Sequence, residues 1–323
     1  WKTFKHLVKY SSKIFLMDAH LTPDVVEWVK KIRQQNDSKS FGVSVFINKF
    51  KKSNKKKIIL SNVFDVLKDA TNKLKENKKV YIACNGSIEK INAYAELLKR
   101  AKIRGPRKGR APLSESERNK LMLNVLVIHR ETLYKKEVKQ AIDNLNGTTG
   151  WGSYDAVIVS PSIQSGLSYD IRDTFHSIYG IFSNYTSSSN DCIQMLDRIR
   201  HPISDEIMVS IHMGNNNIGA CSESAILSSF KSKTSHLWEV QQQLEMITDY
   251  EIDYNGNNRF ARTDYFELYM NNIINTNTDR KFFIWNFLRA KRMAGFALSV
   301  LATAGLLLLA PRIIAFFERV LPR

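Results

Sequence analysis

The sequence predicts an α/β fold in which a parallel sheet is flanked by helices and followed by a helical C-terminal region. From about residue 56 to residue 212, short apolar runs rich in β-branched side chains alternate with segments of helical spacing. Helical connections of about 10–15 residues between strands imply right-handed crossovers, which make the strands parallel and put helices on both faces. The chain has 323 residues, 43% of them hydrophobic, so it can bury a full core.

The first part of the chain predicts one helix and three strands. Thr22 is a good N-cap and Pro23 suits the first helical position, and apolar residues follow at helical spacing from Val25 to Ile32. Runs of apolar and β-branched residues predict strands at Ser12–Asp18, Phe41–Ile47 and Lys56–Leu60.

From Ser61 onward the alternation is regular. Ser61 and Asn62 are candidate caps for a helix that extends to Lys75. The strands that follow are Val80–Cys84, Leu121–Ile128, Tyr154–Ser160 and Glu206–His212, with a further apolar segment at Phe175–Phe182. The helices between them are Ser87–Arg100, Lys135–Leu145 and Asn190–Ile199. Beyond Asn217 only helical patterns remain, at Ser222–Ser229, Ser235–Ile247, Arg262–Ile274 and Arg280–Lys291.

The chain is strongly basic. Lys and Arg total 48 against 31 for Asp and Glu, a formal charge of +17. Such an excess favours a polyanionic partner, either nucleic acid or anionic lipid. The alternative is that the base composition of the gene makes the protein rich in Asn and Lys, which would produce the same positive charge. Basic stretches at 49–57 and 100–110 suit contact with a nucleic-acid backbone about as well as they suit a solvated loop.

Cysteine and histidine spacing predicts no metal site. The cysteines lack C-x-x-C spacing, which also argues against a disulfide framework and makes a reducing compartment the default. The scattered histidines do not pair with carboxylates at ligand spacing, so we treat them as structural.

The composition changes abruptly near the C-terminus. Residues 293–323 contain no Lys and no Asn, and Ala294–Ala310 is apolar or small throughout, bounded by Arg292 and Arg312. This length is at the lower edge of what spans a bilayer. A transmembrane helix, a buried helix and a foreign tail joined to the chain are the three interpretations.

The stretch from Tyr154 to Pro202 carries the clearest site. It combines a buried strand, a loop with Gly166, and two closely spaced arginines, Arg198 and Arg200. Ligands of open α/β sheets bind at the carboxyl ends of strands, and arginine is well suited to clamp a phosphate. We therefore expect the loop and both arginines to meet in one phosphate-facing site. The chain has no G-x-x-x-x-G-K-[ST] loop and no H-E-x-x-H motif. These residues alone could therefore not catalyse hydrolysis.

Three segments resemble the second, RecA-like motor domain of a superfamily 2 helicase. Val157–Asp170 resembles motif V, Gln194–Arg200 resembles motif VI, and Val80–Ser87 resembles motif IV. The Q-x-x-x-R-x-R spacing, together with Leu16–Thr22, is most similar to herpesvirus-type replication origin-binding proteins. The resemblance covers roughly residues 12 to 215, and Asp197 stands where the superfamily usually has glycine.

The resemblance implies a role for each matching residue. Arg198 and Arg200 would be arginine fingers that reach the γ-phosphate of ATP, held with Mg²⁺ mainly by a missing upstream domain. Gln194 would orient the nucleotide or water, and Gly166 and Asp170 would line the cleft. Asp18 would couple the ATP state to movement at the edge between domains. The residues implied to bind strand phosphates are Asn85, Gly86, Ser87, Ser160 and Ser162.

The resulting expectation is the C-terminal half of an ATP-dependent DNA helicase that acts in replication. Its expected parts are the end of a first motor domain and connector (1–38), the second motor domain (39–215), a helical appendage (216–292) and the apolar tail (293–323). Because the first residue is Trp1 and no secretory signal follows, we expect a fragment. The expected partners are single-stranded DNA and the upstream domain. Residues 294–310 leave a membrane as a further possible partner. The expected location is intracellular, in a nucleus or at a viral replication site.

Two other functions fit the sequence. One is a non-catalytic basic module that binds nucleic acid through charge alone. The other is a membrane-tethered α/β transferase that uses Gly166 and the two arginines on a donor phosphate. Two arginines on a solvated helix, beside an ordinary turn glycine, would need no function at all.

Overall fold

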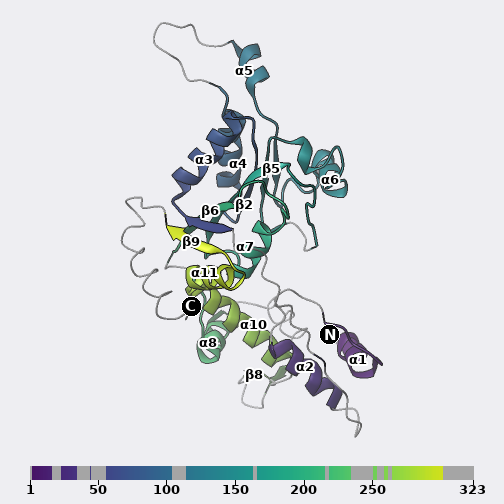
Figure 1. The fold of residues 1–323 in the computed structure, drawn as a ribbon. Helices are drawn as coiled ribbons and strands as arrows, with labels where there is room; N and C mark the ends of the chain where they lie inside the picture. The colour runs from purple at the N-terminus through teal and green to yellow at the C-terminus, as the bar shows by residue number, and fades with distance from the viewer. Residues whose placement is uncertain are drawn as a thin grey trace. The chain divides into compact units, whose positions relative to one another are not determined.

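The computed structural model of the chain describes residues 2–16, 23–34, 44, 56–103, 114–162, 166–214, 218–233, 250–252, 258–260 and 264–300 (Figure 1). The chain divides into two compact units. We call Phe50–Asn217 with Phe282–Arg323 the sheet unit, and Trp1–Lys49 with Ile218–Lys281 the second unit.

The sheet unit is built on seven parallel strands. Their spatial order is β3-β4-β2-β5-β6-β1-β9. The strands are β1 (Lys57–Leu60), β2 (Lys79–Cys84), β3 (Val125–Ile128), β4 (Ala156–Val159), β5 (Phe175–Ser183), β6 (Glu206–His212) and β9 (Ala297–Val300). The helices are α3 (Val63–Lys75), α4 (Ile88–Lys99), α5 (Glu115–Leu121), α6 (Lys136–Asp143), the 3-10 turn η1 (Trp151–Ser153), α7 (Ser189–Leu196) and α11 (Phe283–Met293).

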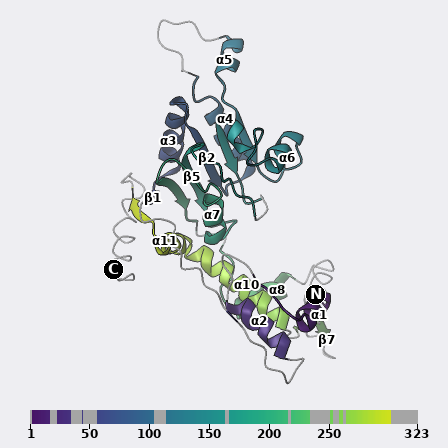
Figure 2. The same ribbon diagram turned by 45° about the vertical axis from the view of Figure 1, so that its right-hand side comes forward.

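Helices cover both faces of this sheet (Figure 2). Along β2 the buried side chains alternate: Val80 and Ile82 pack with α3 and α4, whereas Tyr81 and Ala83 pack with α6, α7 and α11. A strand buried on both faces needs a continuous apolar run, and that run is what the sequence shows. The predicted fold class, a parallel α/β sheet with flanking helices and further helices after it, is confirmed.

The second unit is described in shorter pieces. Its elements are α1 (Lys2–Tyr10), α2 (Pro23–Gln34), α8 (Glu223–Lys233), α10 (Asp264–Lys281) and a two-stranded antiparallel pair, β7 (Tyr250–Ile252) with β8 (Asn258–Phe260). Val8, Trp28 and Ile32 form one small buried cluster of this unit. The helix predicted from Pro23 is therefore confirmed, and the β7–β8 pair was not predicted. The predicted elements Phe41–Ile47 and Ser235–Ile247 lie outside the described residues, apart from residue 44.

Two predicted strands are corrected. Residues 12–16 form no strand, and the exposed side chains of Phe15 and Leu16 explain this, because an isolated apolar run has no sheet to join. The strand predicted from Leu121 begins only at Val125. A capping box between Ser114 and Glu117 starts α5, which ends at Leu121.

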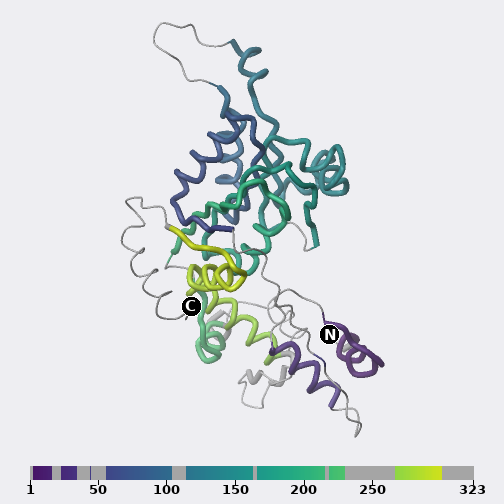
Figure 3. The backbone as a smooth tube through the Cα atoms, in the orientation of Figure 1, coloured from purple at the N-terminus to yellow at the C-terminus, as the bar shows by residue number. Residues whose placement is uncertain are grey.

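The C-terminal apolar segment begins with a strand. Ala297–Val300 pairs in parallel with β1 at the edge of the sheet, in the register Lys57 to Ala297 and Leu60 to Val300. This strand is the yellow end of the coloured tube in Figure 3. The two interpretations that make this segment a helix, transmembrane or buried, are therefore wrong over Ala297–Val300, and residues 301–310 lie outside the described residues. Across the described ranges, no helix has both the length and the apolar content that crossing a membrane requires.

Candidate functional site

A one-residue parallel bridge joins the two segments that carry the predicted site. Tyr169 pairs with Ile199. The backbone N–H of Tyr169 donates to the carbonyl of Arg198 (2.8 Å), and the N–H of Arg200 donates to the carbonyl of Tyr169 (3.1 Å). Helix α7 has already ended at Leu196, so the prediction that both arginines lie on a helix is wrong. In an extended bridge, neighbouring side chains point to opposite sides, and residues 198 and 200 flank the paired residue.

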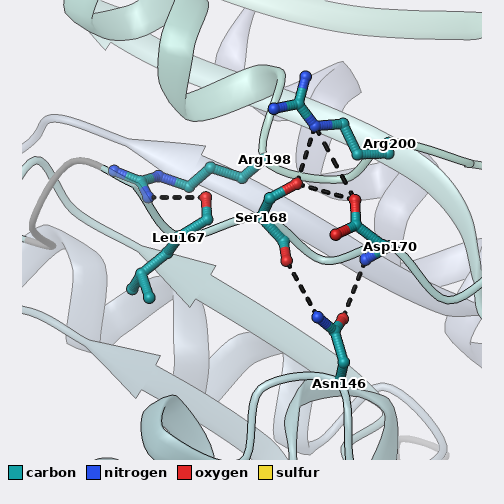
Figure 4. Close-up of polar contacts among 6 residues, drawn as sticks. All are labelled: Asn146, Leu167, Ser168, Asp170, Arg198 and Arg200. Carbon is teal, nitrogen blue, oxygen red and sulfur yellow. Dashed lines mark hydrogen bonds and ion pairs between the residues drawn. The ribbon is translucent and has the colours of Figure 1, made fainter.

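Arg200 is held by a small polar network (Figure 4). Its Nε donates to Ser168 Oγ (2.8 Å) and lies 4.0 Å from Asp170 Oδ1, while Ser168 Oγ donates to that same carboxylate oxygen (2.9 Å). Asn146 fixes the loop from below: its Oδ1 accepts from the backbone N–H of Asp170 (2.9 Å) and its Nδ2 donates to the carbonyl of Ser168 (3.3 Å). The side chain of Arg200 is 49% exposed. The network therefore orients a guanidinium whose terminal nitrogens point away from Ser168 and Asp170 (Figure 4).

Arg198 has a different environment. The residue is 8% exposed, and its Nη1 donates to the carbonyl of Leu167 (3.3 Å). Burial lowers the pKa of its guanidinium, although the nearby Tyr81 works in the opposite direction. An arginine stays protonated even so, and its charge is directed toward the inside of the loop. The two arginines are therefore not equivalent.

The turn before Arg198 is anchored from α11. Asp197 is the C-cap of α7, and its Oδ1 accepts from Lys291 Nζ at 3.0 Å. The side chain of Lys291 is 1% exposed, and its Nζ lies 4.8 Å from the centre of the Phe296 ring. Where the resemblance leads one to expect a glycine, this chain has one half of an ion pair to a buried lysine.

The predicted single site divides between two ends of the sheet. The Tyr169 ring stacks on Trp151, which precedes β4, and the N–H of Ile203 donates to the carbonyl of Phe175, the first residue of β5. The arginine cluster thus lies near the amino ends of these strands. Ser160, which follows β4, lies at the carboxyl end. The arginines do meet the segment that follows Gly166, at Leu167, Ser168 and Asp170, as predicted. The expected position of this cluster at the carboxyl ends is wrong, because the segment after Gly166 runs back along the sheet.

Gly166 itself has a φ of +98°, in the region that L-residues avoid. Its position meets no other atom within 4 Å of an added Cβ, so the glycine is needed for backbone conformation and not for space. Gln194 is exposed on α7. Asp18 and Gln164 lie outside the described residues.

The predicted phosphate-binding residues do lie at the carboxyl ends of β2 and β4, but they differ in availability. Asn85 is 2% exposed, and its amide is used internally, accepting from the N–H of Ser183 (2.7 Å) and donating to its carbonyl (2.7 Å). Ser160 is also buried and donates to Ser162 Oγ (3.1 Å). Three of the predicted residues, the partly exposed Gly86 and the exposed Ser87 and Ser162, reach the surface.

Sequence reasoning missed Ser168, Asn146 and Lys291. Ser168 could have been found, since it lies two residues before Asp170 in the same motif. Asn146 and Lys291 come from distant segments, and nothing in their sequence neighbourhood indicates the contacts they make.

The described residues give no sign of metal or disulfide chemistry. Within them, no group of three or more His, Cys, Asp or Glu side chains could hold a metal ion. The three cysteines are free, and burial raises the pKa of Cys84 to about 11, so its thiol is not a reactive thiolate.

Comparisons with known proteins find viral relatives whose names are of the helicase/primase kind. A protein of African swine fever virus, provisionally named as a member of a helicase/primase complex, is 25% identical over 138 residues, which is 43% of this chain and 13% of that protein. The equivalent protein of another isolate is 40% identical over 50 residues, or 16% of this chain and 5% of that protein. The chain thus spans a small part of the curated relatives it matches.

Structural likenesses are weaker. The chain is 14% identical to the S. cerevisiae Dbp5 structure bound to RNA and ADP BeF3, with a TM-score of 0.37, covering 71% of this chain and 52% of that one. A CRISPR-associated protein is 13% identical, with a TM-score of 0.33, covering 73% and 24%. No protein-family profile matches the sequence.

Proposed function

We propose that the sheet unit is the C-terminal, RecA-like motor domain of an ATP-dependent DNA helicase, with Arg200 as its arginine finger. The observation that carries the proposal is the network around Arg200. It joins the segment that resembles motif V, through Ser168 and Asp170, to the segment that resembles motif VI, at a half-exposed guanidinium.

The residues present fit a nucleotide phosphate. The Nε of Arg200 is held by Ser168 and faces the Asp170 carboxylate, and this leaves the terminal amino groups of the planar fork for a bidentate partner. Phosphoryl transfer is accelerated mainly by placing positive charge against the transferred group, so a pre-oriented arginine is the contribution a second domain can make. We assign ATP and Mg²⁺ mainly to an upstream motor domain, and Gln194 and Gly166 to the rim of the same cleft.

Arg198 has a supporting role in this proposal. Its burial and its bond to the Leu167 carbonyl suit a residue that holds the loop after Gly166 against the turn after α7. This differs from the expectation that both arginines act as fingers.

The replication origin-binding type remains a finer part of the proposal. It rests on the resemblance of Leu16–Thr22 and of the Q-x-x-x-R-x-R spacing, whereas the viral relatives have names of the helicase/primase kind. Either type would act in DNA replication, on single-stranded DNA, in a nucleus or at a viral replication site.

Substitution of Arg200 in the full-length protein tests the proposal. Arg200→Ala should lower DNA-stimulated ATPase by about 10³- to 10⁵-fold while DNA affinity is kept, because the charge acts on the transferred phosphoryl group. Arg200→Lys should restore little, since an ammonium cannot form the bidentate fork. Arg172→Ala, at an exposed arginine close in sequence to the cluster, is the matched control and should leave the rate unchanged. Wild-type ATPase in Arg200→Ala would rule out the finger.

A non-catalytic nucleic-acid-binding module is the second candidate, favoured by the formal charge of +17. In that case Arg200→Ala would weaken DNA binding, with a reduced salt slope, and there would be no ATPase to lose. The same two assays therefore separate the candidates.

A further inference from the structure

The turn that follows β3 has a rigid frame. His129 is 3% exposed, and its Nδ1 lies 3.2 Å from the backbone N–H of Glu131, which makes Nδ1 an acceptor. Nε2 then carries the hydrogen and donates to Asn92 Oδ1 (3.2 Å) on α4. Burial lowers the pKa of this imidazole, in keeping with a neutral ring. His129 thus ties the turn to the neighbouring helix.

Thr132 completes the frame. Its Oγ1 donates to the carbonyl of Val127 (2.8 Å) and accepts from the N–H of His129 (2.9 Å). The backbone N–H of Leu133 donates to the His129 carbonyl and that of Lys135 donates to the Thr132 carbonyl. The residues between these bonds therefore have a fixed backbone from the end of β3 to the start of α6.

This frame presents an aromatic ring to solvent. Tyr134 is 80% exposed, the second most exposed of the large hydrophobic side chains in the described residues, and Lys139 Nζ lies 6.0 Å from its ring centre. Exposing such a ring has no benefit for folding, because its apolar surface would be more stable out of water. The segment from residue 130 to residue 139 contains four basic residues (Arg130, Lys135, Lys136, Lys139) and two acidic ones (Glu131, Glu137).

The turn lies at the carboxyl edge of the sheet, beside the predicted phosphate contacts. The N–H of Ser160 donates to the carbonyl of Ile128, which places the loop after β4 next to the turn after β3. β2, which leads into Gly86 and Ser87, is the next strand in the order β3-β4-β2. Loops from three adjacent strands therefore share one edge, and the Tyr134 turn is at its outer end.

We propose that Tyr134 is a stacking platform for an unpaired base of a single-stranded nucleic acid whose phosphates contact Arg130, Lys135 and Lys139. An exposed ring among basic side chains is the combination that binds single strands, because every base has a π-face and every nucleotide a negative charge. Lys139 beside the ring, together with the excess of basic over acidic residues along this turn, would repel a basic protein surface and suit a polyanion. The proposal deepens the function proposed above and rests on it, with Gly86, Ser87 and Ser162 at the same edge as the expected contacts to strand phosphates.

Two oligonucleotides that differ only in their bases test the platform. The full chain is titrated with fluorescein-labelled oligothymidylate and with an abasic oligomer of equal length, using fluorescence anisotropy. Tyr134→Ala should weaken binding of the oligothymidylate by about 5- to 100-fold and leave binding of the abasic oligomer unchanged. Tyr134→Trp should bind the oligothymidylate at least as tightly as the wild type. The same titration with oligouridylate compares RNA with DNA.

Tyr10 supplies a matched control. It is a 58% exposed tyrosine in the second unit, and Lys9 Nζ lies 5.5 Å from its ring centre. Tyr10→Ala should leave both affinities unchanged. Photocrosslinking with 5-iodouracil oligomers should identify Tyr134 by mass spectrometry, which a general loss of stability could not produce.

The outcomes separate this inference from the proposed function. If the wild type binds the oligothymidylate and Tyr134→Ala binds it equally well, the platform is wrong while the helicase assignment stands. Equal losses from Tyr134→Ala and Tyr10→Ala, or an equal loss on the abasic oligomer, would also reject stacking. A wild-type chain that binds neither oligomer would reject both proposals.

Discussion

At the scale of single residues, the pair of Lys291 and Asp197 departs furthest from ordinary protein chemistry. Burying an ammonium group costs several kcal/mol unless a carboxylate compensates it, and Lys291 is 1% exposed. Its partner is the residue directly before Arg198, at a Nζ–Oδ1 distance of 3.0 Å. The geometry of the arginine segment therefore depends on a side chain in α11.

Removing either partner should have unequal effects. Asp197→Ala should lower the free energy of unfolding by about 3 kcal/mol, because it leaves the buried ammonium without its carboxylate. Lys291→Met should cost clearly less, since it removes the buried charge along with the bond and keeps the volume. Urea unfolding followed by circular dichroism would measure both. Equal losses of unfolding free energy in the two variants would contradict the interpretation that the unpaired buried ammonium group destabilises Asp197→Ala.

At the scale of elements, β9 shows how tertiary contacts override a local pattern. Ala297–Val300 belongs to a stretch of apolar and small residues without a charged side chain, in which Ser299 and Thr303 are too few to define a helical face, so its sequence is compatible with helix or strand. The N–H of Ala297 donates to the carbonyl of Lys56 (2.8 Å), and the parallel ladder continues to Val300. The exposed backbone edge of β1 selects the strand.

A proline at position 297 distinguishes the two structures. In the first turn of a helix beginning at Ala294, proline would be tolerated. In β9, Ala297→Pro removes the donor to Lys56, and we expect a loss of about 1–3 kcal/mol in urea unfolding together with faster hydrogen exchange in β1. Ala297→Val keeps the N–H at this exposed position and serves as the control, with little change expected. Unaltered stability and exchange in the proline variant would argue against the strand.

At the scale of the whole molecule, two histidines, the buried His129 and the partly buried His176, make stability depend on pH. Burial is the main cause that lowers the pKa of both His129 and His176 below the ordinary 6.5. The unfolded chain therefore binds more protons than the folded one as the pH falls through about 6.5, so stability falls with it. Carboxylates with lowered pKa values, such as Glu76 and Glu96, start from an ordinary value of 4.5 and titrate below this window.

We expect the urea midpoint to decrease between about pH 7.5 and pH 5.5, with a shallower decrease in His129→Gln. A glutamine at this position can still hydrogen-bond to Asn92, but its side chain has no titratable proton. His6→Gln, on an exposed face of α1 in the second unit, should leave the slope as it is in the wild type. An unchanged slope in His129→Gln would show that His129 does not contribute to it.

The sequence alone determined the α/β class, the order of the buried strands along the chain and the segments that carry the candidate site. These follow from local properties: apolar runs must be buried, helical spacing produces one apolar face, and caps such as Asn62, whose side chain accepts from the N–H of Asp65, act within one turn. The continuous apolar run Val80–Cys84, for example, is typical of a strand that is buried on both faces.

Only the tertiary structure decided what each candidate residue can do. Asn85 is turned inward by Ser183 on another strand, and Arg198 by the Leu167 carbonyl, while Arg200 stays half exposed because Ser168 and Asp170 hold it there. The loop after Gly166 and the serines after β4 lie at different ends of the sheet. Each of these facts depends on contacts between distant segments, and such contacts are absent from the spacing of residues along one segment.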